Sequence, residues 1–214
     1  MKGKTVLIVG GTSDIGFALA KKVSDAGARV IVSSRSKHKE SYNFDYIPVD
    51  LTVDSDVADL VGIAGNIDHL AITIKSPLVV ENFLEINNND VRNAFETKFW
   101  GQYNLVKKIH KNINIGGSIT MTSGSLGIKP HKGFSTMSAV AGAIDSLCRS
   151  LALELAPLRV NSVSPGFKTL EELKDKIPLG LGTSQQMANS YFYLMNDDYV
   201  TGTNLITDGG ALLV

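Results

Sequence analysis

The chain has 214 residues, of which 43% are hydrophobic, enough for one domain with a full hydrophobic core. Its 21 basic residues balance 21 acidic residues, so no field of positive charge favours nucleic acid or an anionic membrane. The single cysteine, Cys148, excludes an internal disulfide framework, and no apolar run reaches the length of a membrane span. We expect a single cytoplasmic domain over residues 1–214, and no spacing of histidine, cysteine or acidic residues suggests a metal site.

The first segment in chain order predicts a strand joined to a helix by a glycine-rich turn. Residues 5–9 form the continuous β-branched and aliphatic run that is typical of a strand buried on both faces. Gly10 follows at the sharp turn, and apolar residues then repeat at helical spacing over residues 14–26. We expect Gly16 to let this helix pack closely on the strand. The helix N-terminus would favour a pyrophosphate group, although an ordinary glycine-containing turn is the alternative for a glycine cluster alone.

The rest of the chain alternates strands with helices, which predicts an α/β fold with a doubly wound parallel sheet of about seven strands. Only residues 36–45 separate the second strand from the third, too few for a crossover helix with its turns. The run from Asn87 to Asp90 predicts a turn and a helix cap. Strands are predicted near residues 5–10, 29–34, 46–49, 68–74, 117–122, 159–163 and 203–207, and helices near 14–26, 54–64, 89–112, 135–155 and 184–195.

Arg35 lies just past the second predicted strand, and no acidic residue stands at that strand's end. In a doubly wound nucleotide-binding sheet this position meets the adenosine ribose. An acid there favours NAD, whereas an arginine accommodates the 2′-phosphate of NADP. A solvated loop cation is the other interpretation of Arg35. Together with the glycine-rich turn, the position favours NADP(H), with NADPH preferred.

Several motifs then occur in a fixed order along the chain. The turn from Gly10 to Gly16 has the pattern Gly-x-x-x-Gly-x-Gly, with Asp14 in place of the middle glycine. The most specific stretch is Ser-Leu-Ala-Leu-Glu-Leu-Ala-Pro at residues 150–157, followed by Arg-Val-Asn-Ser-Val-Ser-Pro-Gly at residues 159–166. Further matching segments are residues 49–52, 116–123, 200–202 and 208–210. In this order the motifs resemble the short-chain dehydrogenase/reductase family almost end to end, which implies a Rossmann-like fold and an oxidoreductase with a nicotinamide cofactor.

The resemblance implies a set of cofactor-binding residues at the ends of the strands. Asp50 and Leu51 match the strand end that contacts the adenine in the family. Asp14 is expected to weaken binding of the pyrophosphate unless its carboxylate turns outward to cap the helix. Residues 167–177 match only a short remnant of the lobe that covers the substrate. The full predicted set is Gly10, Thr12, Ser13, Asp14, Ile15, Gly16, Ser34, Arg35, Asp50, Leu51, Thr73, Pro165, Gly166 and Thr169.

Met137 and Ala141 stand where the family has its catalytic tyrosine and lysine. In the family the tyrosine passes a proton to or from the substrate oxygen, and the lysine lowers the tyrosine pKa and holds the nicotinamide ribose. A thioether and a methyl group cannot act as general acids. No tyrosine occurs between Asn104 and Ser190, so a shift in register does not restore the usual acid.

The remaining two catalytic positions also differ from the family. The serine position falls on Gly124, between Ser123 and Ser125, and the asparagine position falls on Lys98. One interpretation is a remodelled site that reduces a carbonyl or oxidises an alcohol. Lys98 would then approach the vacated lysine position, and Ser123 or Ser125 would hold the substrate oxygen. The segment from Thr97 to Trp100 is expected to face the sheet.

Other interpretations remain open at this point. The chain can be a pseudoenzyme that acts as a cofactor-binding sensor or assembly module, and Lys98 can be a surface cation. A third interpretation is a register error with a nearby polar group in the catalytic role. His131 lies in the loop before the tyrosine position and can donate a proton near neutral pH, although a solvated loop histidine is more common. We expect a small-molecule substrate if the chain is active. The small and aromatic residues of helices 89–112 and 135–155 favour a homodimer or homotetramer.

Overall fold

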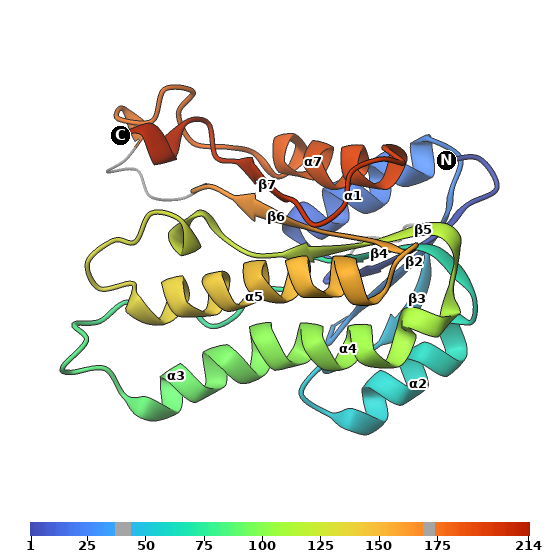
Figure 1. Cartoon of the computed structure of the whole chain (residues 1–214), viewed down its shortest axis with the longest axis horizontal. Helices are drawn as coiled ribbons and strands as arrows, with labels where there is room; N and C mark the ends of the chain where they lie inside the picture. The colour runs from blue at the N-terminus through green and yellow to red at the C-terminus, as the bar shows by residue number, and fades with distance from the viewer. Residues whose placement is uncertain (37–43, 169–173) are drawn as a thin grey trace.

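The computed structural model describes residues 1–36, 44–168 and 174–214, which form one seven-stranded sheet between two layers of helices (Figure 1). The strand order is β3-β2-β1-β4-β5-β6-β7, and every neighbouring pair is parallel. The strands are β1 (Thr5–Val9), β2 (Arg29–Ser34), β3 (Asp45–Pro48), β4 (Ile67–Ile72), β5 (Ile113–Thr122), β6 (Arg159–Pro165) and β7 (Asn204–Thr207). Because the chain winds outward in both directions from β1 and β4, a crevice is expected between these two strands at their carboxyl ends.

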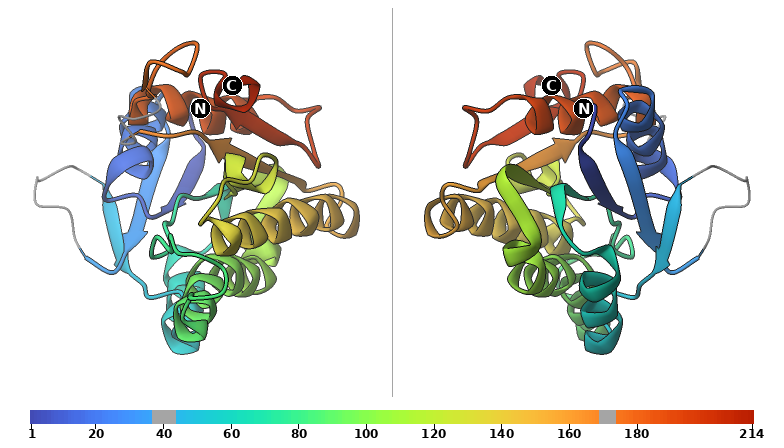
Figure 2. Two further views of the ribbon diagram at one scale, coloured as in Figure 1. Left: turned by 90° about the vertical axis from the view of Figure 1, so that its left-hand side faces the viewer. Right: turned by 90° about the vertical axis from the view of Figure 1, so that its right-hand side faces the viewer.

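Helices cover both faces of this sheet (Figures 1 and 2). One face carries α1 and α7, and the other carries α2, α4 and α5. Strand β1 explains the arrangement: Leu7 and Val9 belong to one hydrophobic core, and Val6 and Ile8 belong to the other. The helices are α1 (Asp14–Asp25), α2 (Asp54–Ala64), α3 (Asn88–Ala94), α4 (Gly101–Ile109), α5 (Ser135–Glu154) and α7 (Ser184–Asn196). The predicted fold class is thus confirmed.

The predicted helix over residues 89–112 is divided in the structure. Helix α3 passes into a π-helical turn, η1 (Phe95–Trp100), then into α4 and a 3₁₀ turn, η2 (His110–Asn112). The Gln102 side chain donates to the Lys98 carbonyl at 2.9 Å and to the Thr122 carbonyl at 3.1 Å, and accepts from the Thr122 N–H at 3.0 Å. This side chain therefore ties the irregular turn to the end of β5, a contact that helical periodicity does not encode.

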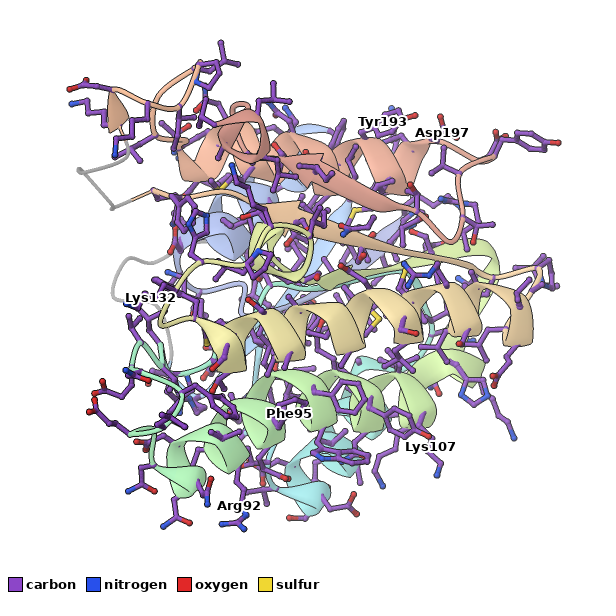
Figure 3. The ribbon with its side chains drawn as sticks, turned by 60° about the vertical axis from the view of Figure 1, so that its left-hand side comes forward. Arg92, Phe95, Lys107, Lys132, Tyr193 and Asp197 are labelled. Atoms are coloured by element: carbon purple, nitrogen blue, oxygen red, sulfur yellow. The ribbon has the colours of Figure 1, made fainter. Side chains whose placement is uncertain are left out.

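The expectation that residues 97–100 all face the sheet is wrong for Trp100, whose side chain is 44% exposed. The π-turn rotates the helix, so Trp100 reaches the outer surface and packs against the rings of Phe99 and Tyr103. Arg92 and Lys107 also extend away from the sheet, on the outer side of α3 and α4 (Figure 3).

The helix cap predicted at Asn87 is confirmed, because its side chain accepts a hydrogen bond from the Asn89 N–H at 2.8 Å. The connection from β2 to β3, expected to be too short for a helix, falls mostly on residues 37–43, outside the described residues. The expected remnant lobe over 167–177 lies partly outside them as well. Within the described ranges, no helix combines the length and the apolar composition needed to cross a membrane.

The glycine-rich turn packs too tightly for a side chain at Gly10, Gly11 and Gly16, where an added Cβ would lie within 3.0 Å of a neighbouring atom. Gly10 has a φ of +84°, in the region that favours glycine. A Cβ at Gly16 would lie 2.2 Å from the Gly10 carbonyl oxygen and 2.4 Å from Thr73 Oγ1. The expected close packing at Gly16 is confirmed, and it presses the first turn of α1 against the ends of β1 and β4.

Gly16→Ala is therefore expected to lower the free energy of unfolding by about 3 kcal/mol or more, because the new Cβ meets backbone that cannot move aside. The matched control is Gly62→Ala in α2, where an added Cβ has no neighbour within 4 Å. That change should raise stability by about 0.5 kcal/mol through helix propensity. Urea unfolding measures both, and equal stability of the two variants would contradict the packing argument.

Candidate functional site

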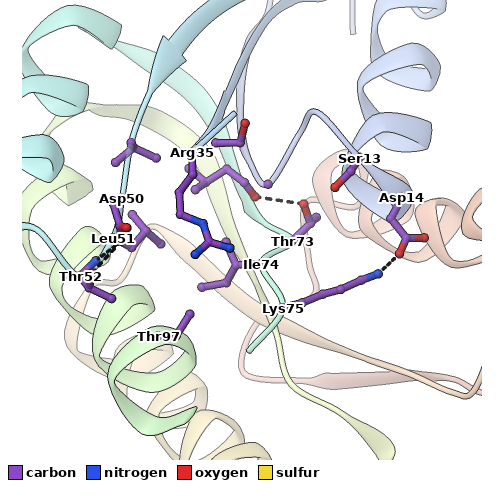
Figure 4. Close-up of a pocket in the computed structure, with 14 residues that line it drawn as sticks. Ser13, Asp14, Arg35, Asp50, Leu51, Thr52, Thr73, Ile74, Lys75 and Thr97 are labelled. Carbon is purple, nitrogen blue, oxygen red and sulfur yellow. Dashed lines mark hydrogen bonds and ion pairs between the residues drawn. The ribbon is translucent and has the colours of Figure 1, made fainter. Parts of the chain in front are cut away.

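A pocket of about 400 Å³ lies at the carboxyl ends of β1 to β4, at the expected crevice (Figure 4). Eight predicted cofactor-binding residues line it: Gly10, Ser13, Asp14, Ser34, Arg35, Asp50, Leu51 and Thr73. The wall also contains residues to which the sequence assigned no role, namely Val9, Val49, Thr52, Ile74, Lys75 and Thr97. The structure therefore brings segments from four strand ends and from η1 to one cavity.

Arg35 extends into this pocket from the end of β2 (Figure 4). The chain around it is held by a short hydrogen-bond relay. The Thr12 hydroxyl donates to Ser34 Oγ at 2.8 Å, and the Ser34 hydroxyl donates to the Ser36 carbonyl at 2.6 Å. The relay links the glycine-rich turn to the end of β2, so the guanidinium approaches the cavity from a supported backbone.

Asp50, just after β3, supplies a carboxylate on the same side of the pocket as Arg35 (Figure 4). The N–H and hydroxyl of Thr52 donate to its Oδ1 at 3.0 and 2.7 Å. These two bonds lower the pKa of Asp50, and the Arg35 charge acts in the same direction against the opposing effect of burial. Asp50 is therefore a hydrogen-bond acceptor at neutral pH. Its backbone N–H is held by the Asp56 carboxylate at 3.0 Å.

Asp14 and two lysines lie at the other end of the pocket. Asp14 is the first residue of α1, and its carboxylate forms ion pairs with Lys75, which follows β4, and Lys168, which follows β6. The Ser184 hydroxyl, at the start of α7, donates to the same carboxylate. Neither lysine was predicted as a site residue. The signal available in the sequence was the joint departure of Asp14 and Lys75 from family motifs.

Lys98 lies on the π-helical turn η1 and reaches the end of β5. Its Nζ donates to the Ser123 carbonyl at 2.8 Å. Burial lowers the pKa of Lys98 to about 8, while the negative charge of Asp145 opposes this shift. The hydrogen bond and the half-buried side chain argue against a freely solvated surface cation, because the amine is directed to the segment that carries the serine position.

Asp145 is a buried acidic residue of α5. Burial raises the pKa of its carboxyl, although neighbouring hydroxyls and cations favour the charged form. The Ser162 hydroxyl of β6 donates to it at 3.3 Å. Lys98 and Asp145 thus place one cationic and one acidic group near the end of β5.

The two predicted serines are both buried. The Ser123 hydroxyl donates to the Ala141 carbonyl at 3.0 Å, so it bonds to α5 in this structure. Ser125 begins the 3₁₀ turn η3 (Ser125–Gly127), which packs on α5. A Cβ at Gly127 would lie 3.0 Å from the Ala141 Cβ. The lysine position of the family is therefore packed beneath this turn.

Met137, at the tyrosine position, packs its side chain against the main hydrophobic core. His131 contacts the rings of Phe134 and Phe167, with centroids 6.5 and 6.0 Å away. Over the residues that the structure describes, no group of three or more histidine, cysteine and acidic residues is arranged to hold a metal ion.

The remaining predicted cofactor residues lie behind or beyond the pocket. Ile15 is buried in the first turn of α1. Gly166 follows β6 and packs on Asp208, since an added Cβ would lie 2.6 Å from the Asp208 Cα. Pro165 ends β6 at the same edge of the sheet. Thr169 lies outside the described residues.

The donor set fits a phosphorylated dinucleotide. Cationic groups line both ends of the pocket, Arg35 at one and Lys75 at the other, and Lys168 pairs with Asp14 behind Lys75's end. Asp50 offers an acceptor for an amino group, and Ile74 contributes apolar wall. The N–H groups of α1 begin beside the cavity, where a helix favours a phosphate. The cations and the helix N–H groups suit phosphates, the Asp50 carboxylate suits the amino group of a base, and Ile74 suits its apolar ring.

Comparisons with known proteins agree with this geometry. The family model for enoyl-(acyl carrier protein) reductase matches residues 10–211. Short-chain dehydrogenase/reductase ucsE of Acremonium sp is 30% identical, with 100% of this chain and 97% of the relative covered. A small-chain dehydrogenase in complex with NADPH superimposes with a TM-score of 0.89 at 28% identity, covering 100% of both chains. The MalC reductase/Diels-Alderase from Malbranchea aurantiaca superimposes with a TM-score of 0.90 at 27% identity, covering 100% of this chain and 97% of that one.

The glycine-rich turn and the sheet order thus agree with a family that the chain matches over nearly its full length. The protein belongs to the short-chain dehydrogenase/reductase family of oxidoreductases.

Proposed function

We propose that this protein binds NADPH and transfers hydride between that cofactor and a small carbonyl or alcohol at a remodelled site. The observation that carries the proposal is Arg35, which extends into the pocket from the end of β2 with no acid beside it on that strand end. A guanidinium at this position suits a 2′-phosphate. Two related structures support the proposal, since one contains NADPH and another is named a reductase.

In this proposal the cofactor lies across the carboxyl ends of the strands. Arg35 and Ser34 bind the 2′-phosphate and ribose, and Asp50 and Leu51 contact the adenine. The first turn of α1 faces the diphosphate. We assign the nicotinamide side to Pro165 and Gly166, at the end of β6. Gly10, Gly16, Thr12 and Thr73 shape the turn that positions these groups.

When bound, the cofactor supplies the hydride that reduces a carbonyl carbon. Lys98 provides a cation at the end of β5, where it can hold the nicotinamide ribose hydroxyls by N–H donation. With a pKa of about 8, the amine is mostly protonated at pH 7 and needs no tyrosine partner to remain a donor. Ser123 and Ser125 are the hydroxyls closest in sequence to the family's serine position, and we assign the substrate oxygen to one of them.

A second candidate function is a cofactor-binding module without turnover. The packing of Ala141 beneath η3 favours it, as does the hydrogen bond from Ser123 to the Ala141 carbonyl. Consumption of NADPH with a panel of small carbonyl compounds separates the two candidates. Assembly into a homodimer or homotetramer stays a prediction, and the exposed Trp100 beside Tyr103 supports it.

Arg35→Ala should abolish most of the preference for NADPH over NADH. Charge-assisted hydrogen bonds to the 2′-phosphate contribute about 1.5–3 kcal/mol, or roughly 10- to 100-fold in affinity. Isothermal titration with each cofactor measures the ratio of dissociation constants. Arg92→Ala is the matched control, since that arginine lies on the outer side of α3. Equal binding of both cofactors by the unaltered protein would contradict this part of the proposal.

Lys98→Ala should weaken NADPH binding several-fold with little change in fold, because the cation beside the nicotinamide ribose is lost. Lys98→Asn, which restores the family's usual residue, should not recover the affinity, since Ala141 offers no partner. Lys107→Ala on the outer side of α4 is the control. If Lys98→Ala binds NADPH as tightly as the parent, Lys98 has no role in holding the cofactor.

The lowered pKa of Lys98 also predicts a pH-dependent stability difference. Below about pH 8 the amine is charged in both the folded and unfolded states, and its burial opposes folding. Between pH 8 and 10.5 the unfolded chain binds more protons, so this penalty declines as pH rises. Lys98→Met should thus gain stability at pH 7, on the order of 2–3 kcal/mol, and lose the advantage by pH 10.5.

Urea unfolding at several pH values measures this difference, with Lys107→Met as the exposed control. A constant difference between Lys98→Met and the parent protein across that range would show that Lys98 titrates normally.

A further inference from the structure

Asp14 occupies an unusual backbone position at the diphosphate end of the pocket. Its φ is +55°, and it is the only non-glycine residue with a positive φ within the described ranges. Most side chains disfavour this conformation, although aspartate tolerates it better than bulky residues. The conformation directs the Asp14 carboxylate toward Lys75, as Figure 4 shows.

The cluster joins four segments that are distant in sequence. Lys75 comes from the chain after β4, Lys168 from the chain after β6, and Ser184 from the start of α7. The Lys168 ammonium also donates to the Ser184 hydroxyl oxygen at 3.3 Å, which completes the cluster. Asp14 lies between them at the start of α1. Its ion pairs therefore lie between the pocket that Arg35 and Asp50 line and the end of β6.

The balance of charge and burial distinguishes the two lysines. The side chains of Asp14 and Lys168 are only 20% and 21% exposed, whereas Lys75 is 68% exposed. Burial lowers the pKa of Lys168, so its ammonium depends on a nearby anion. Two ammonium groups share one carboxylate, which leaves an excess positive charge beside the N–H groups of α1. This environment suits an anion that carries more negative charge than one carboxylate.

We propose that Asp14 is an internal counter-ion that holds Lys75 and Lys168 in place until the diphosphate of NADPH takes over their ammonium groups. The inference rests on the proposed function only for the identity of the ligand. A carboxylate and a phosphate accept the same charge-assisted hydrogen bonds from lysine, so one can replace the other. Asp14 therefore lowers the affinity for the cofactor, and the two lysines raise it.

Asp14→Asn tests this inference because it removes the charge and keeps a residue that tolerates a positive φ. We expect it to bind NADPH at least about 5-fold more tightly than the parent, measured by isothermal titration. Lys168→Ala should bind at least about 5-fold more weakly, and Lys75→Ala should show a smaller loss because that lysine is more exposed. Lys168→Ala should cost more affinity in the Asp14→Asn background, where the competing anion is absent.

The matched control is Asp54→Asn. Asp54 is likewise the first residue of a helix, α2, and pairs with Lys108 at 3.1 Å, but its side chain is 79% exposed. Its removal should leave NADPH affinity unchanged. If Asp14→Asn does not fold, as judged by circular dichroism, Asp14→Gly is measured in the same way. Unchanged or weaker NADPH binding by the folded Asp14 variant would overturn the proposal and make Asp14 a structural link.

Inorganic pyrophosphate is the second probe, and it separates this proposal from the proposed function. If neither the parent nor the variant binds NADPH, the proposed function fails. The counter-ion role is then judged on pyrophosphate alone: tighter binding by the Asp14 variant than by the parent supports it, and equal or absent binding overturns it.

Discussion

The packing of Gly16 against Gly10 and Thr73 is the contact on which the geometry of the site depends. Thr73 donates both its N–H, at 2.8 Å, and its hydroxyl, at 3.0 Å, to the Val9 carbonyl. Strand β1, the start of α1 and the chain after β4 therefore form one rigid corner. The corner lies where the sheet winds outward in both directions, so the N–H groups of α1 and the ends of β2 and β3 face the same crevice.

The positive charge at this corner comes from where the fold places a few basic residues, and not from an excess of basic residues in the chain. The whole chain has a formal net charge of zero, yet Arg35 and Lys75 line the crevice and Lys168 pairs with Asp14 at its edge. Arg35 stands at one end, and Lys75 and Lys168 stand at the other with Asp14 between them. A low-dielectric crevice strengthens these charges compared with the same groups on an open surface.

The end of β5 receives a lysine from an irregular helical turn. The sequence resemblance implies that the family's lysine position falls on α5 at Ala141, which is covered by η3. The Lys98 amine reaches the end of β5 from the π-helical turn before α4. The Gln102 side chain stabilises that turn by bonding to both the Lys98 carbonyl and the end of β5. An irregular helical turn at a candidate site agrees with the frequent use of such turns in functional regions.

The order and type of the main elements could be predicted because they follow from local patterns. Continuous apolar runs such as residues 5–9 indicate strands buried on both faces, and helical periodicity locates the longer helices. The carboxyl ends of parallel strands lie at the same edge of a sheet, whatever the conformation of the loops that connect them. For that reason Arg35 could be assigned to the pocket from its place just after a strand, whereas Asp50 was assigned from the family resemblance.

The sequence by itself therefore determined the fold class and the side of the sheet that holds the pocket. The tertiary structure alone decided which polar groups meet there, because those contacts join residues far apart in the chain. Asp14 is 61 residues from Lys75 and 154 from Lys168, and Gln102 is 20 residues from Thr122. Periodicity describes which face a residue occupies within one element, and it holds no information on the partner that folding brings to that face.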